Sequence, residues 1–99
     1  MARLLDHEEI ARQLGALPGW DGDSMALRRT YELPDFLTAI RGVEEIAVHA
    51  EAMDHHPDID IRWRTLHLSL STHSAGGVTQ LDIELAYQIH EVLTRLGAT

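Results

Sequence analysis

The sequence of 99 residues contains no cysteine and no lysine, and it has no apolar run near the ~20 residues that a membrane-spanning helix needs. Without cysteine there is no disulfide framework, no thiolate nucleophile and no cysteine-ligated zinc site. The N-terminus also lacks the apolar core of a leader peptide. These absences predict a soluble, cytoplasmic protein with no membrane partner.

Basic charge is scarce as well. Eight arginines stand against 16 acidic residues, and the formal net charge is −8. Proteins that bind nucleic acids usually carry a basic stripe, because counterion release drives that binding. The arginines here are scattered, so no direct nucleic-acid partner is expected.

The length fits one domain over residues 1–99, and the pattern predicts three helices. The first begins at the capping pair Asp6 and Glu9, with Leu5 packing on Ile10, and ends at Pro18-Gly19. The central helix has Pro34 in its first turn and ends around Asp54 to His56, before Pro57. Its predicted buried stripe is Phe36, Ile40, Val43, Ala47 and Ala50. The last helix starts at Thr79 and Asp82 and closes at Gly97, with a predicted stripe of Leu81, Leu85, Ile89, Val92 and Leu96.

Two hairpins lie between the helices. The first turns at the "DGDS" of residues 21–24, and alternation of apolar residues marks its second strand, with Arg29 as an interruption. In the second hairpin, Leu66, Leu68 and Leu70 form one face of a strand, and Ile59, Ile61 and Trp63 share a face of its neighbour. The order helix, hairpin, helix, hairpin, helix predicts an α+β fold: a two-layer domain with a four-stranded antiparallel sheet and the helices packed on one face.

Seven histidines are many for this length, and three of them occupy positions suited to chemistry. His55 and His56 lie at the helix-to-strand corner before Pro57, and His73 ends the last strand. Glu51 precedes His55 by one helical turn and could orient that imidazole. The same residues also fit a polar surface, and Asp82 is explained by helix capping alone. A metal site is not expected, because adjacent histidines cannot easily point both rings at one ion and no HExxH spacing is present.

In these residues the chain resembles the pterin-4a-carbinolamine dehydratase family. The family pattern is a charged residue, three positions, His-His-Pro, an aromatic, a later histidine and a later aspartate. The matching residues here are Glu51, His55, His56, Pro57, Trp63, His73 and Asp82. Two positions depart from the pattern, since Arg64 replaces a frequent asparagine and Leu81 replaces a basic residue.

The resemblance implies loss of water from a 4a-hydroxytetrahydropterin, with the pterin as substrate and no cofactor. It makes His55 and His73 the acid/base pair, and His56 a third catalytic residue that holds and orients the substrate. The residues that would bind the pterin or line its pocket are Trp20, Glu51, Asp54, Pro57, Ser71, Thr72 and Asp82. A homodimer or homotetramer is also implied.

A second function remains open on the same fold. Animal members of the family also act as a dimerisation cofactor of a homeodomain transcription factor, and some relatives assist assembly of the carbon-fixing enzyme. Those relatives tend to lose the histidine set. The intact set in this chain therefore favours the enzyme over a non-catalytic interaction or assembly protein.

Overall fold

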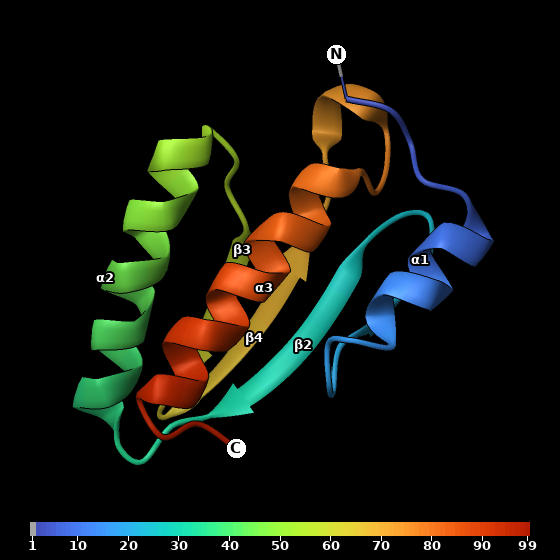
Figure 1. Cartoon of the computed structure of the whole chain (residues 1–99). Coiled ribbons are helices and arrows are strands. Elements are labelled where there is room, and N and C mark those ends of the chain that lie inside the picture. The colour runs from blue at the N-terminus through green and yellow to red at the C-terminus, as the bar shows by residue number, and fades with distance from the viewer. Residues whose placement is uncertain (1) are drawn as a thin grey trace.

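The computed structural model describes residues 2–99, so Met1, the first residue of the predicted domain, lies outside the described residues. The observed order is helix, hairpin, helix, hairpin, helix, as predicted, with one added turn of 3-10 helix, η1 (Figure 1). The elements are α1 (His7–Leu14), β1 (Asp21–Gly22), β2 (Leu27–Glu32), α2 (Phe36–Met53), β3 (Asp58–Arg62), β4 (Thr65–Leu70), η1 (His73–Ala75) and α3 (Gln80–Arg95).

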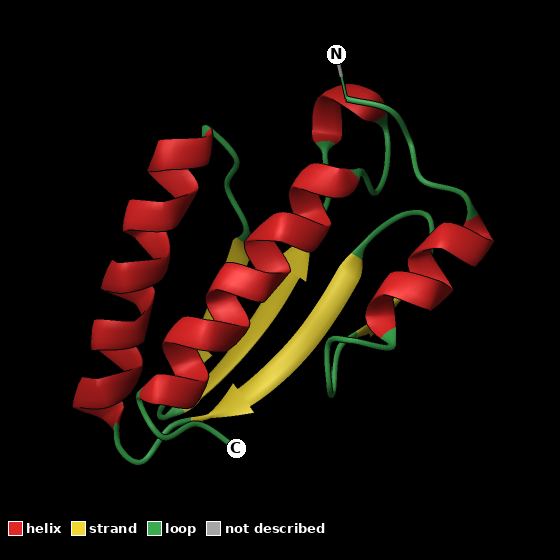
Figure 2. Ribbon diagram, in the orientation of Figure 1, coloured by secondary structure: helices red, strands yellow, loops and turns green. Residues whose placement is uncertain are grey.

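The four strands form one antiparallel sheet in the order β1-β2-β4-β3. Figure 2 shows the helices together on one side of this sheet, with α2 and α3 across its face and α1 beside β2. The predicted two-layer α+β fold is therefore confirmed. No helix within residues 2–99 is long and apolar enough to cross a membrane.

The alternation of β4 decides which face of the sheet is buried. Leu66, Leu68 and Leu70 are at most 3% exposed and join the core under the helices. His67, between them, is exposed on the opposite face. Each leucine buried in this way contributes about 1.5–3 kcal/mol relative to an exposed one. The far face is polar, and the predicted homodimer or homotetramer stays a prediction.

The prediction for the buried face of α2 was wrong for Phe36 and Ala47 but right for Ala50, and Val43 is partly buried against the core. Phe36 is 51% exposed and Ala47 is exposed, although both belonged to the predicted stripe. The buried residues are Ala39, Gly42, Ile46 and Ala50. Apolar residues surround most of this helix, so spacing alone does not select a face. Packing against α3 decides the face, and at Gly42 it leaves no room for a side chain: a Cβ there would lie 2.6 Å from Leu93 Cδ2 of α3.

The start of α2 and the end of α1 also differ from the predictions. Asp35 caps α2 by accepting a hydrogen bond from Thr38 N, so Pro34 precedes the helix instead of lying in its first turn. Helix α1 ends at Leu14, before Pro18-Gly19, in a series of tight turns.

Trp63 does not extend the face of β3. It lies in the turn after Arg62 with φ of 56° and is 71% exposed. Arg64, the first departure from the family pattern, stacks over the Trp63 ring at 4.9 Å and pairs with Glu32 at 2.5 Å. The turn that closes the hairpin β3–β4 therefore places the Arg64 guanidinium against the Trp63 ring and the Glu32 carboxylate.

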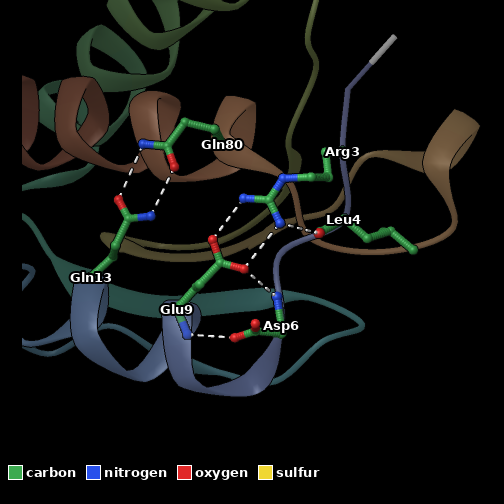
Figure 3. A network of polar contacts seen from close by, with 6 residues as sticks. All are labelled: Arg3, Leu4, Asp6, Glu9, Gln13 and Gln80. Carbon is green, nitrogen blue, oxygen red and sulfur yellow. Dashed lines mark hydrogen bonds and ion pairs between the residues drawn. The ribbon is translucent and has the colours of Figure 1, made fainter.

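The N-terminal segment and α1 are bound to each other and to the start of α3 (Figure 3). Arg3 donates to both carboxylate oxygens of Glu9, at 3.1 and 2.7 Å, and this hydrogen bonding lowers the pKa of Glu9 to about 2. The amides of Gln13 and Gln80 exchange two hydrogen bonds, and Leu5 N donates to Val78 O at 2.9 Å. The first turn of α3, which carries Asp82, is therefore bound by hydrogen bonds to α1 and to the N-terminal segment.

Candidate functional site

His55 is positioned by the way α2 ends. Asp54 takes the left-handed conformation, with φ of 49° and ψ of 45°, and its N–H bonds to the carbonyls of Ala50 and Glu51. His55 N also donates to Ala50 O, at 3.0 Å. This double closure is a Schellman motif, which ends many helices and turns the chain inward. As predicted, the helix therefore ends directly before the two histidines.

The left-handed conformation of Asp54 yields a stability prediction. We expect Asp54→Gly to be about 1 kcal/mol more stable than Asp54→Ala, because only glycine takes this conformation without a Cβ clash. Urea denaturation of the two variants measures the difference. The matched control is Ala47, exposed in mid-helix, where Ala47→Gly is expected to destabilise by about 1 kcal/mol. Equal stability of the two Asp54 variants would contradict the expectation.

The imidazole of His55 is buried against a carboxylate. His55 Nε2 lies 2.6 Å from Asp82 Oδ1, and the two residues are 7% and 0% exposed. The other oxygen, Oδ2, accepts hydrogen bonds from Thr72 Oγ1 at 2.8 Å and from Thr79 N at 2.9 Å. Burial of a carboxylate is costly unless its oxygens are hydrogen-bonded, and here both are.

Asp82 combines two functions. With Thr79 it forms the predicted capping box of α3, near the positive end of the helix dipole. It also binds His55, because the C-terminal end of α2 and the N-terminal end of α3 lie at the same end of the molecule (Figure 1). The predicted capping role of Asp82 is therefore confirmed, and the same side chain also holds His55, whereas its predicted contact with the pterin stays a prediction.

His56 points to a different partner from that of His55. Its Nε2 lies 2.7 Å from Glu51 Oε2, and both side chains are largely exposed. The sequence interpretation paired Glu51 with His55. That pairing was wrong, because the left-handed turn at Asp54 ends the helical spacing and brings His56 back toward Glu51.

Glu51 and His56 border a groove of about 320 Å³ between α2 and the start of β3. Apolar side chains supply most of its wall, and Pro57 forms one side. The full lining is Ile46, Ala47, Ala50, Glu51, His56, Pro57 and Ile59. Such an apolar groove with a few polar groups at its edge is typical of a small-molecule site. His55 and His73 are not among the lining residues.

His73 opens η1 directly after the buried Thr72. Thr72 exchanges backbone hydrogen bonds with Gly77, so the loop is closed at its base. His73 is exposed, and its ring makes no hydrogen bond to another residue within 2–99. His73 is therefore one residue away from the network that holds His55, with its imidazole free.

The remaining predicted site residues differ in their surroundings. Thr72 uses its hydroxyl and both backbone groups in internal hydrogen bonds, and Ser71 beside it is half-buried. Trp20 is 5% exposed and donates from Nε1 to Tyr31 Oη at 2.9 Å. It lies in the core, and its role as a pterin wall stays a prediction. Asp54 is exposed at the helix end.

Sequence reasoning missed Thr79 as a member of the site. Its hydroxyl lies 2.7 Å from Thr72 Oγ1, and its N–H binds Asp82. The spacing Thr-x-x-Asp predicted the helix cap, but it did not reveal that the capping residue Asp82 also binds His55. Within the described part of the chain, no three His, Cys, Asp or Glu side chains form a group that could hold a metal ion.

The fold and site together define a class: a small two-layer α+β protein with a buried, carboxylate-bound histidine and a second, exposed histidine at one end of its sheet. The chain belongs to the pterin 4 alpha carbinolamine dehydratase family, whose model matches residues 3–92. The family indicated by the histidine pattern is thereby confirmed.

Relatives and solved structures agree with this assignment. A relative from Roseiflexus castenholzii, named after the same dehydratase, is 53% identical over 93 residues, which are 94% of this chain and all of that protein. One from Mycolicibacterium smegmatis is 45% identical over 91 residues, or 92% of this chain and 97% of that protein.

Among solved structures, a transcriptional coactivator/pterin dehydratase from Brucella melitensis superposes with a TM-score of 0.88. It is 33% identical, and the match covers 92% of this chain and 99% of that one. A pterin dehydratase-like protein described as a RuBisCO assembly factor shares the fold, with a TM-score of 0.62 at 13% identity over 75% of this chain and 86% of that one.

Proposed function

We propose that this protein dehydrates a 4a-hydroxytetrahydropterin to a quinonoid dihydropterin and water by histidine acid/base catalysis. Membership of the family supports the substrate class. The observation that supports the mechanism is that His73 directly follows Thr72, whose hydroxyl binds the same carboxylate, Asp82, that holds the imidazole of His55.

The reaction is an elimination that needs one proton donor and one proton acceptor. The C4a–O bond breaks while the leaving oxygen gains a proton. The neighbouring ring nitrogen loses its proton, and its electron pair forms the new C=N bond. No electrons are gained or lost overall, so acid/base groups suffice, and an imidazole serves either role near neutral pH.

The site residues have different proposed roles. Of His55 and His73, one donates a proton to the leaving oxygen of the pterin and the other accepts the proton from the ring nitrogen. His56, paired with Glu51 at the groove, holds and orients the pterin, and the wall at Pro57 and Ile59 packs against the flat ring. Asp54, Ser71 and Trp20 remain proposed pocket residues. The quinonoid product would be reduced again for an aromatic amino acid hydroxylase in the cytoplasm.

The test is an assay of the purified protein with chemically generated 4a-hydroxytetrahydropterin. We expect the ultraviolet absorbance of the 4a-hydroxyl adduct to disappear faster with the protein than in buffer alone. General acid/base catalysis of this kind accelerates a reaction by roughly 10²- to 10⁴-fold. A rate equal to that in buffer would refute the proposal. If affinity capture then recovered a stoichiometric protein partner, the assembly function would replace it.

A further inference from the structure

We propose that Thr72 and Thr79 are positioning residues that hold Asp82, and that Asp82 fixes the tautomer of His55. In this tautomer Nε2 carries the ring proton, and Nδ1 is the nitrogen that exchanges a proton with the substrate. The catalytic half of this inference rests on the proposed function. The tautomer itself does not, and it can be measured without any turnover.

The donor and the acceptor of each hydrogen bond around Asp82 can be assigned, because two of the groups are backbone amides, which can only donate. Thr79 N is an amide and can only donate, and it donates to Oδ2 at 2.9 Å. Thr72 Oγ1 also donates to Oδ2, at 2.8 Å, so its single proton is used there. The contact of 2.7 Å between the two hydroxyls must then run from Thr79 to Thr72. Thr79 Oγ1 in turn accepts from Leu81 N at 3.2 Å.

Every donor in this chain therefore points toward the carboxylate. Leu81 N–H, the Thr79 hydroxyl and the Thr72 hydroxyl form a series that ends at Asp82 Oδ2, and hydrogen bonds in series strengthen one another. Two donors on one oxygen stabilise the ionised carboxylate, which is an acceptor only. Asp82 Oδ1 must then accept as well, and its partner at 2.6 Å is His55 Nε2.

The consequence for His55 follows from the chemistry of imidazole. A neutral ring has one N–H, and a hydrogen bond at one nitrogen selects which nitrogen carries it. With the proton on Nε2, Nδ1 is the basic nitrogen, and it makes no hydrogen bond to another residue within 2–99. The backbone of His55 is held by the Schellman closure of α2, in which His55 N donates to Ala50 O. Only one nitrogen is thus available for proton transfer.

Nuclear magnetic resonance of protein labelled with ¹⁵N-histidine tests the tautomer directly. At a pH where His55 is neutral, long-range proton–nitrogen correlations distinguish the protonated ring nitrogen from the bare one. We expect Nε2 to be the protonated nitrogen, with the His55 signals assigned by their loss in His55→Gln. A bare Nε2 and a protonated Nδ1 would overturn the inference, whatever the enzymatic activity.

Asp82→Asn separates the tautomer from the helix cap. The asparagine oxygen can still accept from Thr72 and Thr79, which leaves its amide group to donate to Nε2. We expect the proton to move to Nδ1 and the dehydration rate to fall at least about 10²-fold, since a base in the wrong tautomer loses its acid/base contribution. An unchanged tautomer, or an unchanged rate with the changed tautomer, would contradict the proposed role of Nδ1.

Thr72 is tested by a matched pair of variants. Thr72→Val removes the donor but keeps the shape, and Thr72→Ser restores the hydroxyl. We expect Thr72→Val to lower kcat about 10-fold at similar KM, an effect equal to the loss of one hydrogen bond that holds Asp82. The proton should stay on His55 Nε2, because Asp82 Oδ1 can still only accept. Thr72→Ser should restore kcat. If Thr72→Val only lowered the melting temperature and left kcat unchanged, Thr72 would be purely structural.

The two proposals fail in different ways. A wild-type protein without dehydratase activity but with the proton on Nε2 refutes the proposed function and leaves the tautomer assignment intact. An active wild-type protein with the proton on Nδ1 supports the function and refutes the positioning role of Thr72 and Thr79.

Discussion

His73→Ala is expected to lower the dehydration rate by about 10²- to 10⁴-fold, the usual contribution of one general acid or base. The free energy of unfolding should stay within about 0.5 kcal/mol of the wild-type value. The reason is that His73 is exposed and its ring has no hydrogen-bonded partner within residues 2–99, so the folded structure loses little with it. Ultraviolet assays and urea denaturation measure the two quantities.

His73 is a cleaner probe than His55. Removal of the His55 ring would leave the buried Asp82 without one of its partners, and a lost partner at a buried carboxylate destabilises the fold. The matched control is His7→Ala, which removes an exposed histidine from the first turn of α1. Its rate should equal that of the wild type. If His73→Ala were as active as His7→Ala, the acid/base pair would have to be sought elsewhere.

Gly77→Ala is expected to lower the free energy of unfolding by about 3 kcal/mol, through steric overlap and a weakened backbone hydrogen bond. A Cβ at this position would lie 2.4 Å from Ser24 O, which accepts a hydrogen bond from Val78 N. Because the obstacle is backbone, no side-chain rotation relieves it. The loop between Thr72 and Thr79 must shift, so activity should fall as well. Thermal unfolding should show a decrease of roughly 4–8 °C for each kcal/mol lost.

The neighbouring glycine supplies the control for this prediction. Gly76 has φ of 80°, and a Cβ there would meet no atom within 4 Å. Asparagine tolerates such left-handed angles, so Gly76→Asn should cost about 1 kcal/mol or less. A Gly77→Ala variant as stable as Gly76→Asn would show that the loop carrying His73 is more adaptable than its close packing indicates.

Local signals in the sequence predicted the elements well. The capping pairs Asp6 with Glu9 and Thr79 with Asp82 both form capping boxes, and Pro57 follows the end of α2 as expected. The alternation in β4 predicted its buried face correctly. Caps, turns and strand alternation depend on residues only a few positions apart, so a single sequence contains the information needed.

Some of the wrong predictions concern features that depend on contacts between residues far apart in the sequence. The buried face of α2 depends on where Leu93 of α3 meets Gly42, and nothing within α2 itself records that contact. The partner of Glu51 changed from His55 to His56 because Asp54 turns left-handed at the helix end. Trp63 left its strand face because the hairpin turn begins one residue earlier than the alternation indicated.

The sequence by itself determined the family and the order of elements and indicated the three histidines proposed for catalysis, because each depends on residue types at fixed separations along the chain. Tertiary structure alone decided the surroundings of those histidines. It buries His55 against Asp82, turns His56 toward Glu51 and leaves the His73 ring without a hydrogen-bonded partner among residues 2–99. The physical reason is that residues 55 and 82 meet only when the opposite ends of two helices are brought together by packing on one sheet, an arrangement that no local spacing encodes.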